Sequence, residues 1–190
     1  MGFYNRTIGL RVASFPSPPG LRAGGIVFIA QSGSAFSALA HNDRRLGFSL
    51  CISSGMELTT SAADYAEWAL TRPHTRVIGM FLEEVRQPQH FMAVLAKASE
   101  QNVPVVILKV GRTLRSASMA LTHTGALAGS DAAFTGMCRS HDVVLVDDPH
   151  VALLNVHVVD YDQTGSGQQL GTFDMRNCVL ARLAHVDQAE

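Results

Sequence analysis

Residues 26–34 read Ile26-Val27-Phe28-Ile29-Ala30-Gln31-Ser32-Gly33-Ser34, an apolar run followed at once by a short polar turn. An uninterrupted apolar run of this length is typical of a strand that is covered on both faces, as in a parallel sheet. The turn ends the strand, and residues 35–45 follow with apolar side chains at helical spacing. The stretch therefore predicts a strand, a tight turn and a helix in succession.

The same alternation continues along the chain. Further strands are predicted over residues 48–53, 77–82, 105–110 and 143–146, each followed or preceded by a break of glycine, serine, aspartate or proline. Helices are predicted between them over 62–70, where Ser61 can form the N-terminal cap, over 88–101, and within 112–140. Strands that alternate with helices predict an α/β fold of three layers, with helices on both faces of a parallel sheet. A flavodoxin-like, doubly wound sheet of five strands in the order 2-1-3-4-5 is our first prediction, and a six-stranded Rossmann variant is the second.

The two ends of the chain do not continue this pattern. Residues 1–24 contain the proline-rich segment 15–20 and are predicted to be an irregular lead-in. Beyond Pro149 the alternation decays, with a strand-like stretch at 151–159, a glycine- and glutamine-rich stretch at 163–169 and a weak helical signal at 176–186. We therefore expect one domain over residues 25–149, preceded by a linker over 1–24 and followed by an atypical tail over 150–190.

Bulk properties narrow the functional classes. The 190 residues carry a net charge of −1, which gives no broad attraction to nucleic acid or to an anionic membrane. No apolar run approaches the roughly 20 residues that span a bilayer. The three cysteines are scattered, lack metal-ligand spacing and fit a reducing cytoplasm. We expect a cytoplasmic protein without a metal site.

Candidate functional residues follow three of the predicted strands. Ligands of doubly wound sheets bind outside the carboxyl ends of the strands. In the order 2-1-3-4-5, strands 1, 3 and 4 are neighbours, so the turn at Ser32, Gly33 and Ser34, the carboxylates Glu83 and Glu84, and the loop that holds His123 are expected to meet at one edge.

These residue types suit phosphoryl transfer. The first N–H groups of a helix that starts at residues 32–34 form an anion site. Glu83 or Glu84 can accept a proton from one nitrogen of the His123 imidazole and leave the other as a nucleophile. Gly125 and Gly129 let the backbone wrap a phosphate group closely. Taken singly, each feature has a plainer interpretation as a turn, a helix cap or a hydrogen-bonded loop histidine.

Six segments in order resemble the flavodoxin-like second domain of nucleoside-diphosphate-forming acyl-CoA synthetases, which are related to the α subunit of succinyl-CoA synthetase. The segments are GIVFIAQSGS (25–34), GFS (47–49), SGME (54–57), VIGMFLE (77–83), PVVILKVGR (104–112) and THTGALAG (122–129). Residues 1–5 look like the last turn of the CoA-binding domain that precedes it in that family. Met56 departs from the asparagine common at its position.

The resemblance implies a function and a set of roles. Such acetate–CoA ligases form acyl-CoA from an acid, CoA and ATP or GTP, with Mg²⁺, through an acyl phosphate and a phosphohistidine. His123 matches the phosphorylated residue, Glu83 the carboxylate that supports it, and Ser32, Gly33 and Ser34 the turn that holds phosphate. CoA and nucleotide are expected to bind to a CoA-binding domain and an ATP-grasp domain, which act as partners, and not to this chain.

Two other interpretations remain beside this one. The chain is alternatively a truncated, non-catalytic remnant, or a regulatory module of the same fold that binds a partner. An FMN-binding flavodoxin is disfavoured, because the first turn lacks the run of hydroxyl residues expected around the FMN phosphate.

Overall fold

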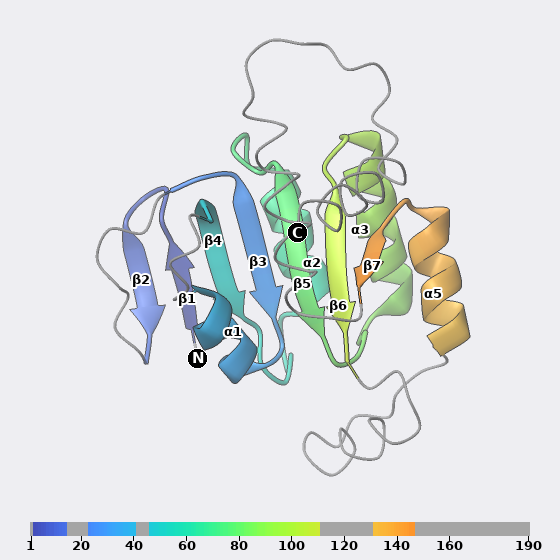
Figure 1. The fold of residues 1–190 in the computed structure, drawn as a ribbon, viewed down its shortest axis with the longest axis horizontal. Helices are drawn as coiled ribbons and strands as arrows, with labels where there is room; N and C mark the ends of the chain where they lie inside the picture. Colours follow the sequence, from blue (N-terminus) through green and yellow to red (C-terminus); the bar gives the residue numbers. More distant parts are fainter. Residues whose placement is uncertain (1, 15–22, 41–45, 111–130, 147–190) are drawn as a thin grey trace, which may run out of the picture.

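The computed structural model describes residues 2–14, 23–40, 46–110 and 131–146, and these residues build a seven-stranded sheet in the order β2-β1-β4-β3-β5-β6-β7 (Figure 1). Five strands are parallel to one another. They are β3 (Ile26–Ala30), β4 (Phe48–Ser53), β5 (Val77–Leu82), β6 (Val105–Lys109) and β7 (Val144–Val146). Their spatial order, β4-β3-β5-β6-β7, confirms the predicted order 2-1-3-4-5.

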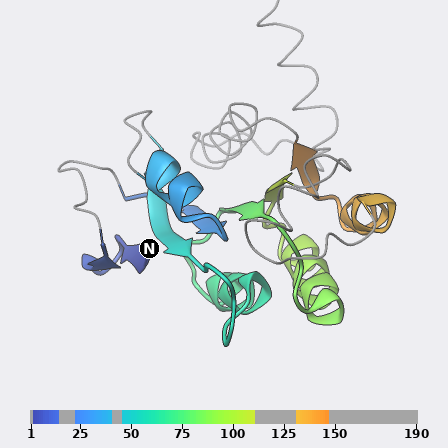
Figure 2. The same cartoon turned by 90° about the horizontal axis from the view of Figure 1, so that it is seen from below.

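Helices cover both faces of this sheet and make three layers. Helix α1 (Gly33–Ala40) lies on one face, and α2 (Ala62–Leu70), α3 (Pro88–Glu100) and α5 (Asp131–Ser140) lie on the other (Figure 2). Strands β3 and β6 are buried at every residue, and alternate residues of β3 face the two layers. Val27 and Ile29 pack with α2 and α3, whereas Ile26 and Phe28 pack with α1.

The local sequence explains where two of these helices lie. Ser61 caps α2 as predicted, and a reciprocal pair of hydrogen bonds with Asp64 completes the cap. Helix α3 starts at Pro88, whose missing N–H is not needed in the first turn. Its predicted inward residues are all buried; they are Phe91, Val94, Leu95 and Ala98.

The start of the chain differs from the prediction of an irregular lead-in. Strands β1 (Gly2–Asn5) and β2 (Leu10–Ala13) form an antiparallel pair, and β1 also pairs antiparallel with β4. The sheet therefore has two more strands than predicted. Tyr4 anchors this addition, because its ring is only 2% exposed and stacks on Phe36 of α1, with 5.3 Å between the ring centroids.

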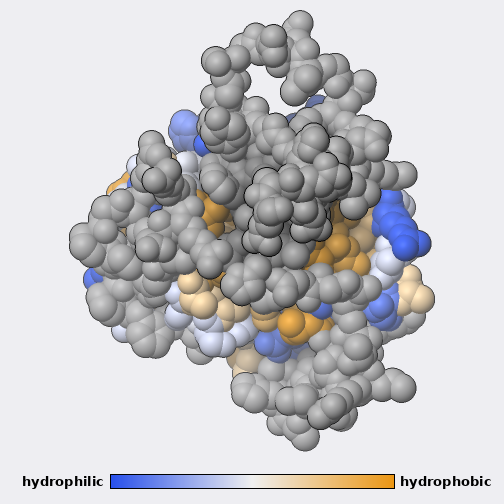
Figure 3. All heavy atoms as spheres, viewed as in Figure 1, coloured by the Kyte–Doolittle hydropathy of each residue, from blue (hydrophilic) through white to orange (hydrophobic). Residues whose placement is uncertain are grey.

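Several predicted elements lie outside the described residues. They are the second half of the helix predicted over 35–45, the first part of the segment predicted over 112–140, and everything predicted beyond residue 146. Among the described residues, no helix is long and apolar enough to cross a membrane. On the face that carries α1, hydrophilic residues gather toward the edge formed by α5 (Figure 3).

Candidate functional site at the carboxyl edge of the sheet

Gln31 joins the end of β3 to the loop that follows β5 at the carboxyl edge of the sheet. It follows β3 directly and is buried, with only 8% of the residue exposed. Its Oε1 accepts hydrogen bonds from the backbone N–H of Glu83 (2.6 Å) and of Glu84 (3.0 Å). Its Nε2 donates to the Glu84 carbonyl oxygen (2.9 Å). The end of β3 is therefore fastened to the loop that follows β5.

The start of helix α1 lies directly after Gln31. The Ser32 hydroxyl accepts a hydrogen bond from the Ala35 N–H (3.3 Å) and lies 2.9 Å from the Ser34 hydroxyl. The Ser32 carbonyl accepts the first helical hydrogen bond, from Phe36. Ser32 thus caps the helix, and the N–H groups of its first turn point beyond the edge of the sheet, where the helix dipole favours an anion.

Glu83 lies at the end of β5, between the ends of β3 and β6. Gln31 holds its backbone N–H on one side. On the other side, the Lys109 ammonium donates to the Glu83 carbonyl oxygen (3.1 Å) and to the Val110 carbonyl oxygen (3.3 Å). Lys109 is itself buried and lies over the Phe134 ring, 5.5 Å from its centroid. Both backbone groups of Glu83 are therefore held by side chains from the two flanking strands.

A second carboxyl group, that of Glu57, reaches the same place from the loop after β4. Burial raises its pKa above the usual 4.5, although hydrogen bonds from Gln31, Ser54 and the Ala62 N–H favour the charged form. The Ser54 hydroxyl donates to Glu57 Oε1 over 2.9 Å. Glu57 has a positive φ of 54°, which is unusual for a residue with a side chain and is kept here by these contacts.

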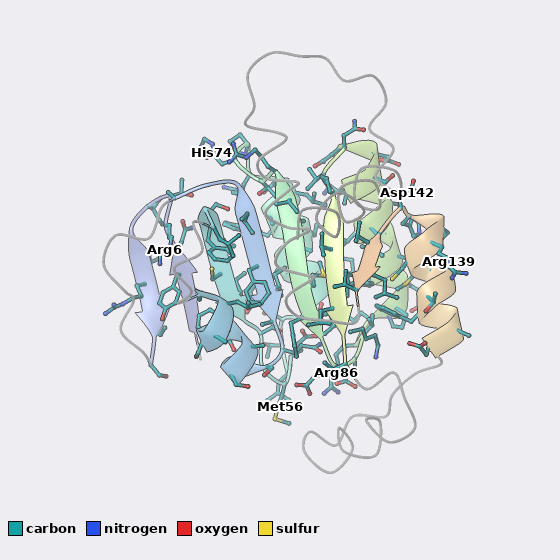
Figure 4. The ribbon with its side chains drawn as sticks, viewed as in Figure 1. Arg6, Met56, His74, Arg86, Arg139 and Asp142 are labelled. Carbon is teal, nitrogen blue, oxygen red and sulfur yellow. The ribbon has the colours of Figure 1, made fainter. Side chains whose placement is uncertain are left out.

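The outer part of this edge carries an ion pair and exposed apolar groups. Arg86 pairs with Glu84, and its charge also favours ionisation of Glu57. A small hollow between α2 and the loop after β5 is lined by Glu57, Glu84, Arg86 and others. Met56, which is 62% exposed, projects from the edge near Arg86 (Figure 4).

The structure places four of the predicted site residues within its described part. Ser32, Gly33 and Ser34 form the start of α1. Glu83 is tied to the same edge because its N–H donates to the side chain of Gln31, the residue that precedes Ser32. The other three predicted site residues, His123, Gly125 and Gly129, lie outside the described residues. Among the residues described, no group of three or more His, Cys, Asp or Glu side chains could hold a metal ion.

Sequence reasoning set Gln31 and Lys109 at the ends of their strands and Glu57 in a turn, but it assigned none of the three a role in the site. Each had a signal in the sequence. Gln31 and Lys109 are polar residues at the ends of otherwise apolar strands, and Glu57 lies in a glycine turn after another strand. Their hydrogen bonds join residues up to 53 positions apart, so their roles depend on the folded topology.

The sheet order, the helices on both faces and a polar site at the carboxyl edge define a doubly wound α/β domain of the flavodoxin type. A family model described as the succinyl-CoA ligase-like flavodoxin domain matches residues 23–158, and the chain belongs to this family.

Curated relatives agree with this assignment. A trans-feruloyl-CoA synthase from an unknown prokaryotic organism is 34% identical over 68% of this chain and 18% of the relative. An ADP-forming acetate–CoA ligase of Archaeoglobus fulgidus is 32% identical over 76% of this chain and 21% of the relative. The alpha subunit of an ADP-forming acetate–CoA ligase of Pyrococcus furiosus is 31% identical over 67% of this chain and 28% of the relative. The matched part of the chain thus spans less than a third of these relatives.

The fold also matches solved structures. An acetyl-coenzyme A synthetase of Candidatus Korarchaeum cryptofilum, solved with phosphate and ADP, aligns with a TM-score of 0.77 at 24% identity. The alignment covers 84% of this chain and 35% of that one. At this identity the likeness concerns the fold.

Proposed function

We propose that the chain is the phosphohistidine-carrying domain of a nucleoside-diphosphate-forming acyl-CoA synthetase. His123 carries the phosphoryl group between an acyl phosphate and a nucleotide while acyl-CoA is made. The observation that supports this most is the meeting of the α1 start and Glu83 at one edge of the sheet, joined by Gln31. The family to which the chain belongs supports it independently.

The proposed step is an in-line transfer at phosphorus. In the direction that starts from the acyl phosphate, one imidazole nitrogen of His123 attacks the phosphorus atom. The bond between phosphorus and the acyl oxygen breaks, and the carboxylate leaves. The proton on the other imidazole nitrogen is held toward the Glu83 carboxylate, which stabilises the cationic ring that forms. A nucleoside diphosphate then takes the phosphoryl group from nitrogen, and every step runs in reverse during acyl-CoA synthesis.

The start of α1 has a separate role in this proposal. The phosphoryl group carries negative charge before, during and after transfer, and the first-turn N–H groups beside Ser32, Gly33 and Ser34 offset that charge. Gly125 and Gly129 let the backbone approach the same group.

We propose two partners for this activity, one that binds CoA and one of the ATP-grasp type that binds the nucleotide with Mg²⁺. The relatives support this division, because they are several times longer than the matched region and include an alpha subunit. Residues 25–149 are proposed as the domain that carries phosphate, with the hairpin of β1 and β2 added to the edge of its sheet and residues 150–190 as a tail.

The test is to incubate the chain with a cognate ATP-grasp partner and γ-labelled ATP, and separately with labelled acetyl phosphate. We expect label on the chain that is lost in acid and kept in base, as phosphohistidine requires. His123→Ala should abolish it. His74→Ala is the matched control, because His74 is exposed and lies away from the carboxyl edge (Figure 4).

Two results would overturn the proposal. Label that survives His123→Ala would place the phosphoryl group on another residue. A wild-type chain that stays unlabelled beside a competent partner would favour the alternative, a non-catalytic module of the same fold that binds a partner.

A further inference from the structure

The side chain of Gln31 makes three hydrogen bonds to backbone groups at the carboxyl edge of the sheet. A carboxamide oxygen accepts two hydrogen bonds and its NH₂ group donates two. Here the oxygen accepts from the N–H groups of Glu83 and Glu84. The nitrogen donates to the Glu84 carbonyl, and Gln31 also favours the charged form of the nearby Glu57 carboxyl group. One buried side chain thus connects β3 to the loop after β5, beside the loop after β4.

We propose that Gln31 is a positioning residue for phosphoryl transfer: it fixes the backbone from which Glu83 projects. This inference rests on the proposed function, in which Glu83 supports His123. Gln31 does not touch the reacting atoms in this proposal. It acts through the position of Glu83 alone.

The geometry around Glu83 explains why the Gln31 side chain can determine the position of the Glu83 carboxylate. Glu83 is the first residue after β5, where the hydrogen bonds of the sheet end. Gln31 from β3 holds its N–H, and Lys109 from β6 holds its carbonyl. Loss of the Gln31 contact frees one side of this residue while leaving the sheet intact. A carboxylate that must meet one imidazole nitrogen tolerates little displacement, since about 1 Å of misplacement can slow a reaction about 100-fold.

Gln31→Glu is the sharpest substitution for a test. It keeps the length, the shape and the oxygen that accepts from the Glu83 and Glu84 N–H groups. It removes the hydrogen bond that is donated to the Glu84 carbonyl and sets a second carboxyl group beside Glu57, so the loop that carries Glu83 loses one tie and is pushed away from the Glu57 carboxyl group. Exchanging the two side chains, Gln31→Glu with Glu57→Gln, restores one donor and one carboxyl group to the same pair. The matched control is Gln101→Glu, the same chemical change at an exposed position after the end of α3.

The experiment measures the rate at which labelled acetyl phosphate phosphorylates the full-length chain, over a range of acetyl phosphate concentrations. We expect Gln31→Glu to lower the maximal rate by about tenfold to 100-fold, while the half-saturating concentration changes much less. The exchanged pair should recover a substantial part of the lost rate. Gln101→Glu should behave as the wild type does.

The outcomes separate this inference from the proposed function. If the wild type acquires no label, or keeps it after His123→Ala, the proposed function fails. If the wild type is labelled through His123 but folded Gln31→Glu reacts at the wild-type rate, only the role of Gln31 fails. The role of Gln31 would also be overturned if Gln31→Glu lowers the maximal rate and the exchanged pair recovers none of it.

A measurement on the unaltered chain guards against a variant that does not fold. Hydrogen exchange should show that the Glu83 and Glu84 N–H groups are protected, because Gln31 binds both of them. Exchange at the rate of exposed loop amides would show that the contact does not hold Glu83, and it would overturn the inference without any variant.

Discussion

Glu57 is a single residue whose charge opposes folding. Burial raises the pKa of its carboxyl group above the usual 4.5, so the folded chain binds this proton more tightly than the unfolded chain does. The free energy of unfolding therefore falls as the pH rises from about 4.5 through the higher pKa of the folded state. Arg86 and the hydrogen bonds from Gln31 and Ser54 limit this effect, and the Glu84 carboxylate, paired with Arg86, lies close by.

We expect the Glu57→Gln variant to gain stability relative to the wild type as the pH rises across that window. Urea unfolding at a series of pH values between 4 and 8 would measure it, and the difference between the two free energies should grow with pH. Glu100→Gln removes an exposed carboxylate at the end of α3 and should give a difference that stays nearly constant. A constant difference for Glu57→Gln as well would contradict the expectation.

At the scale of elements, helix α2 begins with a complete capping box. The Ser61 hydroxyl accepts from the Asp64 N–H, and the Asp64 carboxylate accepts from the Ser61 N–H over 2.7 Å. The hydrogen bonds from Ser61 lower the pKa of Asp64 below its usual 3.8. This contribution to stability is present above pH 3.8 and is lost as the pH falls through the lower pKa of the folded state.

Ser61→Ala should therefore destabilise the chain by about 1 kcal/mol near neutral pH, the typical effect of losing an N-terminal cap. The loss should shrink in strong acid, because protonated Asp64 no longer gains from Ser61. Thermal or urea unfolding at two pH values would measure both effects. Ser99→Ala, an exposed serine in the last turn of α3, should cause no comparable loss; an equal loss there would show that the cap is not the cause.

How much of the fold could be predicted from the sequence depended on the element. Strands such as Ile26–Ala30 and Val77–Leu82 are buried on both faces, so their apolar runs indicate where each strand lies in the sequence and that it belongs to a parallel sheet. Strand β2 is different, because Leu10 and Val12 are 45% and 53% exposed and only pairing with β1 makes the segment a strand. Its conformation follows from tertiary contacts that local sequence does not encode.

The candidate site also contains residues that could be predicted from local sequence and residues that could not. The start of α1 follows from a strand, a break and serine residues close together in sequence, so Ser32 could be predicted. The role of Gln31 depends on Glu83 and Glu84, 52 and 53 residues away, whose N–H groups it binds. A buried glutamine after a strand indicates that partners exist, but only the assembled sheet identifies them.

At the scale of the whole molecule, the N-terminal hairpin covers the edge of the parallel sheet. Strand β1 lies against β4, and Tyr4 pairs in register with Cys51. Cys51 is fully buried, and burial raises the pKa of its thiol. Because the thiolate is the reactive form, we expect Cys51 to resist thiol reagents in the folded chain. That protection depends on the hairpin, since Tyr4 belongs to the same buried cluster.

Deleting residues 2–13 should consequently expose Cys51 to a reagent such as Ellman's while the rest of the sheet persists. The test uses a Cys178→Ser background, because Cys178 lies outside the described residues. Cys138 is the internal control: it is a fully buried residue of α5, near the opposite edge of the sheet, and should remain protected. If Cys51 stays as unreactive as Cys138 after the deletion, the hairpin does not cover it. If both react equally fast, the hairpin is required for the whole fold and is not a local cover.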